Sequence, residues 1–184
     1  MRIISGKAKG LILKAPKGYH TRPTSDRVKE AMFSIIQDLI PDALALDLFA
    51  GTGALGLEAW SRGAKRVIFV EPSSLARRVL SANIAKAGIA SQAIVSKLDA
   101  LSFLKKYDEE PFDLIFMDPP YDNEISINVL DTIVAKKLLA PNGILVWEKS
   151  SKDSSFQPVS GLKLVKEKQY GDTMLLFLEQ IKEE

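Results

Sequence analysis

The sequence contains no cysteine and only one histidine among its 184 residues. The lack of cysteine excludes disulfide bonds, thiolate metal sites and cysteine nucleophiles, and it suits a reducing cytoplasm, where we expect the protein to work. The single histidine, His20, argues against a histidine-based metal site or a serine triad, so we expect no metal; in its loop it is expected to be solvated or capping. No stretch approaches the roughly 18 consecutive apolar residues of a membrane span. The N-terminus also lacks the apolar core of a signal peptide, so we expect no membrane contact.

What the chain does contain is ordinary in amount and uneven in placement. Apolar residues make up 46% and charged residues 26%, which is typical of a soluble globular protein, and the length predicts one domain. Residues 1–29 hold eight Lys or Arg and one acid, a charge of +7, which leaves −5 for residues 30–184. A basic arm on a mildly acidic body predicts a polyanionic partner. The alternative is a solvated, solubilising tail.

Strand and helix patterns alternate along most of the chain. Residues 2–4 and 11–13 predict a small hairpin, and Thr24, Ser25 and Asp26 offer N-caps for a helix that Pro41 ends. Strands are then predicted at 44–49, 66–70, 92–96, 112–117 and 144–147, and helices at 54–61, 73–87, 100–106 and 125–138. Residues 162–168 and 174–178 predict an antiparallel hairpin. This order predicts an α/β fold with a mostly parallel, mixed sheet, with a boundary between an arm at 1–24 and a domain at 25–184.

A glycine-rich loop follows the first strand of the domain. Gly51, Gly53 and Gly56 satisfy the spacing G-x-G-x-x-G of a dinucleotide site, and Glu71 at the end of the next strand could bind a ribose hydroxyl. Asp47, just before the glycines, would repel a pyrophosphate but attract an ammonium and a sulfonium group. The loop therefore favours S-adenosylmethionine over a nicotinamide dinucleotide. No Lys-Ser/Thr follows the glycines, which excludes a Walker-type phosphate loop.

Two further acids follow strands of the same sheet. Asp99 could accept a hydrogen bond from an adenine amino group, cap the following helix, or do both. Asp118 opens the turn Asp118-Pro119-Pro120-Tyr121, whose prolines force the chain out of the sheet at the edge where open α/β sheets bind ligands. One interpretation is a stiff surface turn and nothing more.

The other interpretation of the turn is methyl transfer to an exocyclic amine of a base. The Asp118 carboxylate and the Pro119 carbonyl would accept from the amine, hold it, and aim its lone pair at the methyl group. These contacts would strengthen as positive charge builds on the nitrogen, as catalysis requires. The ring of Tyr121 would stack on the base. No covalent intermediate is needed, which agrees with the absence of cysteine.

The chain resembles the RsmD family of bacterial 16S ribosomal RNA (guanine-N2)-methyltransferases over nearly its full length. The resembling segments are 2–6 with Lys9-Gly10, 21–33, 47–56, Glu71, Asn83, 118–121 and 170–173. The resemblance implies a class I methyltransferase (Rossmann-like) fold: a seven-stranded mixed sheet with a C-terminal antiparallel hairpin and a small N-terminal β-ribbon. It implies S-adenosylmethionine as cofactor, bound by Asp47, Phe49, Ala50, Gly51, Gly53, Glu71, Asp99 and Ala100. It implies catalysis by Asp118, Pro119, Pro120 and Tyr121, and RNA binding by Arg2, Lys7, Lys9, Lys14, Arg22 and Thr24.

The partner that the resemblance implies is 16S rRNA in the small ribosomal subunit or its assembly intermediate. The target base must be splayed out to enter the site. Guanine N2 rather than adenine N6 rests on the resemblance, because the glycine loop and the turn are shared with DNA and protein-glutamine amino-methyltransferases. The alternatives are a DNA adenine-N6 methyltransferase and a non-catalytic RNA-binding or assembly factor; a dehydrogenase is disfavoured by Asp47 and Asp118. Nothing in the sequence requires more than a monomer.

Overall fold

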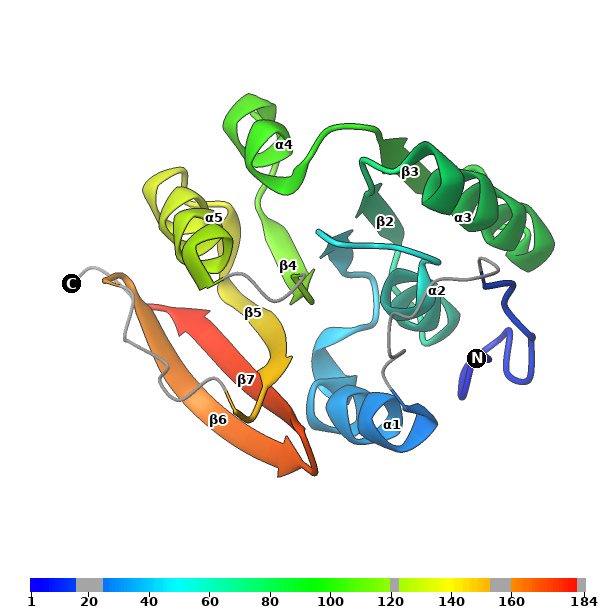
Figure 1. Cartoon of the computed structure of the whole chain (residues 1–184), viewed down its shortest axis with the longest axis horizontal. Coiled ribbons are helices and arrows are strands. Elements are labelled where there is room, and N and C mark those ends of the chain that lie inside the picture. Colours follow the sequence, from blue (N-terminus) through cyan, green and yellow to red (C-terminus); the bar gives the residue numbers. More distant parts are fainter. Residues whose placement is uncertain (16–24, 120–122, 153–159, 182–184) are drawn as a thin grey trace.

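One mixed sheet organises the chain. The computed structural model describes residues 1–15, 25–119, 123–152 and 160–181. Within these ranges seven strands form a sheet in the order β3-β2-β1-β4-β5-β7-β6 (Figure 1). The first five strands in this order pair in parallel, whereas β7 pairs antiparallel with both β5 and β6. The predicted mixed sheet with its C-terminal antiparallel hairpin is therefore confirmed.

The bounds of the elements follow the predicted order closely. The strands are β1 (Leu44–Asp47), β2 (Arg66–Val70), β3 (Ala93–Ser96), β4 (Phe112–Met117), β5 (Leu139–Ser150), β6 (Leu162–Tyr170) and β7 (Thr173–Gln180). The helices are α1 (Asp26–Ile35), the short 3₁₀ helix η1 (Gln37–Leu39), α2 (Ala54–Ser61), α3 (Ser74–Ala87), α4 (Ala100–Lys106) and α5 (Asn123–Ala135).

Two of these bounds differ from the prediction for local reasons. The helix predicted to run to Pro41 stops at Ile35 and tightens into η1. The fifth strand begins at Leu139 rather than at residue 144, because Leu139 already pairs with Phe112 of β4 before the register of the two strands shifts. A β-carbon on Gly143 would lie 2.9 Å from the carbonyl oxygen of Phe112, so only glycine allows this close strand pairing.

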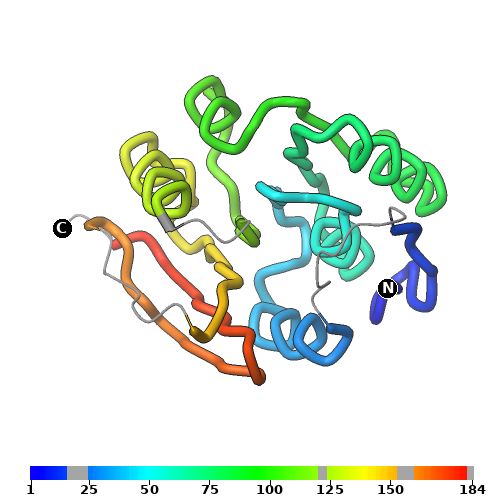
Figure 2. Tube along the Cα trace, viewed as in Figure 1, coloured from blue at the N-terminus to red at the C-terminus, as the bar shows by residue number. Residues whose placement is uncertain are grey.

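The helices cover the two faces of the sheet. Side chains alternate along a strand, and each face of the central strands buries its own apolar set. One set joins Ala45 and Phe116 to α1, α2 and α3, and the other joins Leu46 and Ile115 to α4 and α5. Figure 2 shows the resulting three layers, with the hairpin of β6 and β7 at one end.

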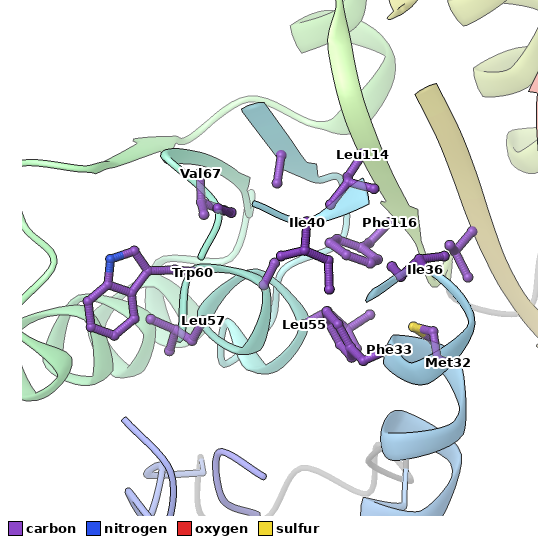
Figure 3. Close-up of a cluster of buried hydrophobic side chains, with 14 of the residues drawn as sticks. Met32, Phe33, Ile36, Ile40, Leu55, Leu57, Trp60, Val67, Leu114 and Phe116 are labelled. Carbon is purple, nitrogen blue, oxygen red and sulfur yellow. The ribbon is translucent and has the colours of Figure 1, made fainter. Parts of the chain in front are cut away.

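The core under α1 and α2 is aromatic and aliphatic. The rings of Phe33 and Phe116 lie 5.4 Å apart, with Leu55, Ile36 and Ile40 among the side chains around them (Figure 3). Phe33 and Phe116 are at most 1% exposed. This packing fixes β4 against β1, so the residues that follow both strands are held in register.

The N-terminal arm packs against the body instead of extending away from it. The predicted ribbon is reduced to one antiparallel bridge between Arg2 and Ile12, with the side chains of Ile3 and Leu13 buried in the core. Figure 2 shows the arm, in blue, beside α2 and α3. The predicted boundary after residue 24 lies outside the described residues. No helix in the described ranges has the length and apolar character needed to cross a bilayer.

Candidate active site

Four carboxylates gather at the carboxyl ends of neighbouring strands. Asp47 ends β1 and pairs in register with Phe116 of β4, which places Asp118 two residues beyond that pair. Glu71 directly follows β2, and Glu148 lies on β5 near the end of its pairing with β4. Because parallel strands end at one edge of the sheet, these acids face a common region. That edge is where the glycine loop leaves β1.

Asp47 is buried deeply enough to resist ionisation. It is 3% exposed, and one carboxylate oxygen accepts a hydrogen bond from the amide of Gly56 at 3.0 Å. Burial raises the pKa of Asp47 to about 7, against the stabilising effect of this amide, and the neighbouring charge of Glu71 adds to the rise. A cation bound nearby would therefore stabilise the ionised form of Asp47.

The three glycines of the loop have different duties. Gly51 has a φ of +52°, and a β-carbon there would meet nothing within 4 Å, so its face is open. A β-carbon on Gly53, whose φ is +82°, would lie 2.4 Å from the Leu80 side chain. On Gly56 it would lie 2.4 Å from the ring of Phe69. Gly53 thus lets the loop approach α3, Gly56 lets α2 pack on β2, and Gly51 leaves room for a ligand.

Glu71 ties the loop after β1 to the loop after β2. One carboxylate oxygen accepts from the amide of Gly51 at 2.9 Å, and the other accepts from the amide of Ser73 at 2.7 Å. A carboxylate has about four acceptor positions, so these two bonds leave capacity for a hydroxyl. The side chain is 9% exposed, which is enough to reach a ligand at the edge.

The remaining predicted cofactor residues line the same edge. Asp99 caps α4 by accepting from the amide of Ser102 at 2.8 Å, and this bond lowers its pKa. It is exposed, so capping does not remove it from solvent. Ala100 behind it is 5% exposed. Phe49 is half-buried, and the amide of Ala50 donates to the carbonyl of Val70.

Asp118 combines access with an unfavourable charge environment. The residue as a whole is exposed, yet the poorly solvated surroundings of its carboxyl group raise its pKa to about 8, with Glu148 and then Asp47 adding to the rise. Asp47, predicted to bind the cofactor, and Asp118, predicted to hold the amine, are therefore close enough for the charge of one to affect the other. Pro119 is half-buried. Pro120 and Tyr121 lie outside the described residues.

Sequence reasoning missed two side chains at this edge. Glu148 carried no recognisable motif, because the strand that holds it was predicted to end at Trp147. Asn83 stood in a resembling segment but was assigned no role. It is fully buried, donates to the carbonyls of Thr52 at 2.9 Å and Lys14 at 3.1 Å, and accepts from the amide of Lys14 at 2.8 Å. It thus joins the glycine loop to the arm.

The predicted RNA-binding residues that the structure describes are all exposed. Arg2 pairs with Asp26 at 3.1 Å, and the ammonium of Lys7 lies 4.0 Å from the ring centroid of Trp60. Lys9 and Lys14 are exposed. Arg22 and Thr24, like His20, lie outside the described residues.

Residues 1–179 match the protein family described as Conserved hypothetical protein 95. The chain belongs to this family. A Bacillus subtilis relative named Putative rRNA methyltransferase YlbH is 37% identical over 175 residues, which cover 94% of this chain and 95% of that protein. A Haemophilus influenzae relative named Ribosomal RNA small subunit methyltransferase D is 35% identical over 173 residues, covering 93% of this chain and 89% of that protein.

Solved structures agree with the family assignment. A structure described as Putative methyltransferase yhhF from Escherichia coli has a TM-score of 0.88 at 32% identity and covers 98% of this chain and 97% of that chain. A putative methylase from Haemophilus influenzae has a TM-score of 0.84 at 30% identity, covering 99% of each chain. The predicted resemblance to the RsmD family and the class I methyltransferase fold are both confirmed.

Family membership does not by itself test the predicted site residues. In this member of the Conserved hypothetical protein 95 family, Asp47, Glu71 and Asp118 come together as the sequence predicted, whereas the roles assigned to them stay predictions. The backbone of Lys14 in the arm is linked to the glycine loop of the site through Asn83.

Proposed function

We propose that this chain transfers the methyl group of S-adenosylmethionine to the exocyclic N2 amine of a guanine in 16S rRNA of the small ribosomal subunit. The observation that carries the proposal is the pair Asp47 and Asp118 on adjacent strand ends, with the glycine loop directly after Asp47. The names of the relatives support rRNA of the small subunit as substrate. We further propose that the protein acts in the cytoplasm as a monomer.

The residues on the β1 and β2 ends fit the cofactor. S-adenosylmethionine supplies an electrophilic methyl group on a positive sulfur, next to an ammonium group. Asp47 offers a buried carboxylate whose raised pKa makes a cationic neighbour favourable. Glu71 offers acceptor capacity for ribose hydroxyls, and the open face of Gly51 lets a ligand approach the backbone. Asp99 and Ala100 follow the next strand, on the side where an adenine would lie.

The residues after β4 fit the accepting amine. A guanine amine is a poor nucleophile, because its lone pair is delocalised into the ring. The Asp118 carboxylate and the Pro119 carbonyl accept from its two N–H groups and hold the lone pair toward the methyl group, and Tyr121 stacks on the base. As positive charge develops on the nitrogen these contacts strengthen, which lowers the barrier. The proton then leaves toward Asp118 or solvent.

The arm at residues 1–24 serves as the RNA-contacting part, and residues 25–184 form the methyltransferase domain. The exposed Lys9 and Lys14 with Arg2 and Lys7 give the arm its positive charge. Arg22 and Thr24 belong to the same assignment. Neutralising phosphates with such side chains supplies sequence-independent affinity and sets the register of the RNA.

The test is to replace Asp118 and measure binding and transfer separately. We expect Asp118→Ala and Asp118→Asn to lower transfer of radiolabelled methyl to small-subunit RNA by at least about 100-fold, because neither replacement can ionise as positive charge develops on the amine. Cofactor affinity, measured by calorimetric titration, should change little. The control is Asp131→Ala, which removes an exposed carboxylate from α5. Full activity in either Asp118 variant would disprove the mechanism.

The modified base is identified by mass spectrometry of 16S rRNA nucleosides from cells lacking the protein. Loss of one N2-methylguanine is the expected result. An unchanged 16S profile together with lost N6-methyladenine in DNA would instead favour the DNA methyltransferase.

A further inference from the structure

A cationic groove runs along the edge of the sheet, beside the proposed active site. Its volume is about 970 Å³, and it lies between α3 and the end of β3. Arg77, Arg78 and Lys97 line it together with the hydroxyl-bearing Ser74, Ser81 and Ser96, and the rest of the lining is apolar. No carboxylate is among the described residues that line the groove, although residues 30–184 as a whole carry a negative charge. Nothing in the proposed chemistry uses these side chains.

The cations of the groove differ in what they do within the fold. Arg77 is half-buried and donates to the carbonyls of Glu71 and Pro72, so it braces the loop after β2. Arg78 and Lys97 are exposed, and their side chains make no hydrogen bond or ion pair with any residue that the structure describes. A long cationic side chain that is held by none of the described residues is available to an external anion.

We infer that this groove binds the sugar–phosphate backbone of the RNA substrate, at a second contact separate from the arm. This inference rests on the proposed function. Phosphodiester oxygens match the lining, because they accept from guanidinium, ammonium and hydroxyl donors alike. The groove also occurs at the right edge: Ser74 and Lys97 follow β2 and β3, at the carboxyl ends where Asp47 and Asp118 lie.

The geometry of α3 connects the groove to the arm. Ser74, Arg78 and Ser81 share one face of the helix, at the spacing of one helical turn. Asn83 and Lys86 share a different face, where Asn83 holds Lys14 and Lys86 donates to the carbonyl of Ile12 at 2.7 Å. Figure 1 shows the arm beside α3. The groove lies along the other face of this helix, which carries Ser74, Arg78 and Ser81.

An RNA backbone that is held on both sides of α3 would assist the proposed reaction. Moving a base out of its stack costs unstacking energy, and contacts to the flanking phosphates hold the strand while the base is extruded. Arg78 and Lys86 lie eight residues apart on α3, or about 12 Å along its axis. Because Lys86 holds the arm at Ile12, the arm and the groove are far enough apart to contact different phosphates of one strand, and each contributes to affinity.

The test compares a charge reversal in the groove with a matched one far from it. The groove variant is Arg78→Glu with Lys97→Glu, which leaves the bracing Arg77 intact. The control is Lys166→Glu with Lys168→Glu on β6, at the opposite edge of the sheet, which changes the net charge equally and also alters exposed side chains. A third variant, Lys9→Glu with Lys14→Glu, reports on the arm. RNA affinity is measured on small-subunit RNA over a range of salt concentrations, and cofactor affinity by calorimetric titration.

We expect the groove variant to weaken RNA binding roughly tenfold at low salt and to reduce the salt slope by about 1–2 relative to the control. Its cofactor affinity and thermal unfolding should match those of the unaltered protein. Three results would overturn the inference. In the first, the groove variant binds RNA as tightly as the β6 control while the arm variant binds weakly; this result would leave the proposed function intact. The cofactor affinity could fall instead of the RNA affinity, which would make the groove part of the cofactor site. The unaltered protein could fail to bind or methylate small-subunit RNA, which would remove the proposed function as well.

Discussion

Asp47 shows at the level of one residue how a binding site costs the fold stability. Its ordinary pKa is 3.8, and burial raises it to about 7 in the folded protein. Between these values the folded chain keeps a proton that the unfolded chain has lost. The free energy of unfolding therefore falls as the pH rises through this window. Under the proposed function, a cationic cofactor would recover that loss on binding.

This cost predicts that Asp47→Asn stabilises the protein without cofactor at high pH but not at low pH. We expect the gain in unfolding free energy, relative to the unaltered chain, to grow by roughly 2–4 kcal/mol between pH 4 and pH 8. Urea unfolding at several pH values measures it. The exposed Asp131→Asn should show no such trend. A gain for Asp47→Asn that does not vary with pH would mean that the pKa of this carboxyl group is not raised in the folded state.

The residues of this edge also show which site residues a sequence can reveal. Asp47 and Asp118 could be predicted because each is followed by residues that end a strand, glycines in one case and prolines in the other. Glu148 could not be predicted, because it lies within β5 and only the register between β4 and β5 brings it near Asp118. Its influence is a matter of tertiary geometry, which no local pattern encodes.

At the scale of elements, Asn83 joins three segments that are distant in the sequence. From α3 its amide satisfies two backbone groups of Lys14 in the arm and the carbonyl of Thr52 in the glycine loop. The strand and helix order could be read from apolar periodicity, since α2, α4 and β4 have the predicted bounds. The join could not, because a polar residue in a helix is usually solvated, and here it is buried by its partners.

We predict that Asn83→Ala lowers the free energy of unfolding by roughly 2–4 kcal/mol, because buried backbone groups lose their partners. The arm should loosen first, so trypsin should cleave after Lys9 or Lys14 faster than in the unaltered protein. Asn128→Ala, at an exposed position of α5, is the matched control. Unfolding measurements and timed proteolysis together check the prediction. If cleavage in the arm keeps its original rate, the link between α3 and the arm is not what holds it.

At the scale of the whole molecule, the arm is part of the fold as well as a charged extension. Glu58 of α2 is fully buried and accepts from the amides of Ile4 and Ser5 at 2.8 and 3.0 Å. It also pairs with Arg62 and with the buried Lys29, whose ammonium donates to the carbonyl of Arg2 at 2.6 Å. From the sequence, eight basic residues in the first 29 suggested either an RNA contact or a solvated tail. Neither interpretation anticipated that a buried carboxylate would hold the arm.

The two roles of the arm can be separated by two kinds of change. Removing residues 1–15 deletes the buried Ile3 and Leu13 and leaves Glu58 and Lys29 short of partners. It should therefore cost about 4 kcal/mol or more, read as a lower unfolding temperature or a lost cooperative transition.

Lys9→Glu with Lys14→Glu alters only exposed side chains, so the unfolding free energy should stay within about 0.5 kcal/mol of the original. The same variant should bind RNA more weakly and with a smaller dependence on salt, because fewer phosphates are neutralised. A truncated chain as stable as the full one would support the interpretation of the arm as a solvated tail, since removing a segment outside the core does not lower the free energy of unfolding.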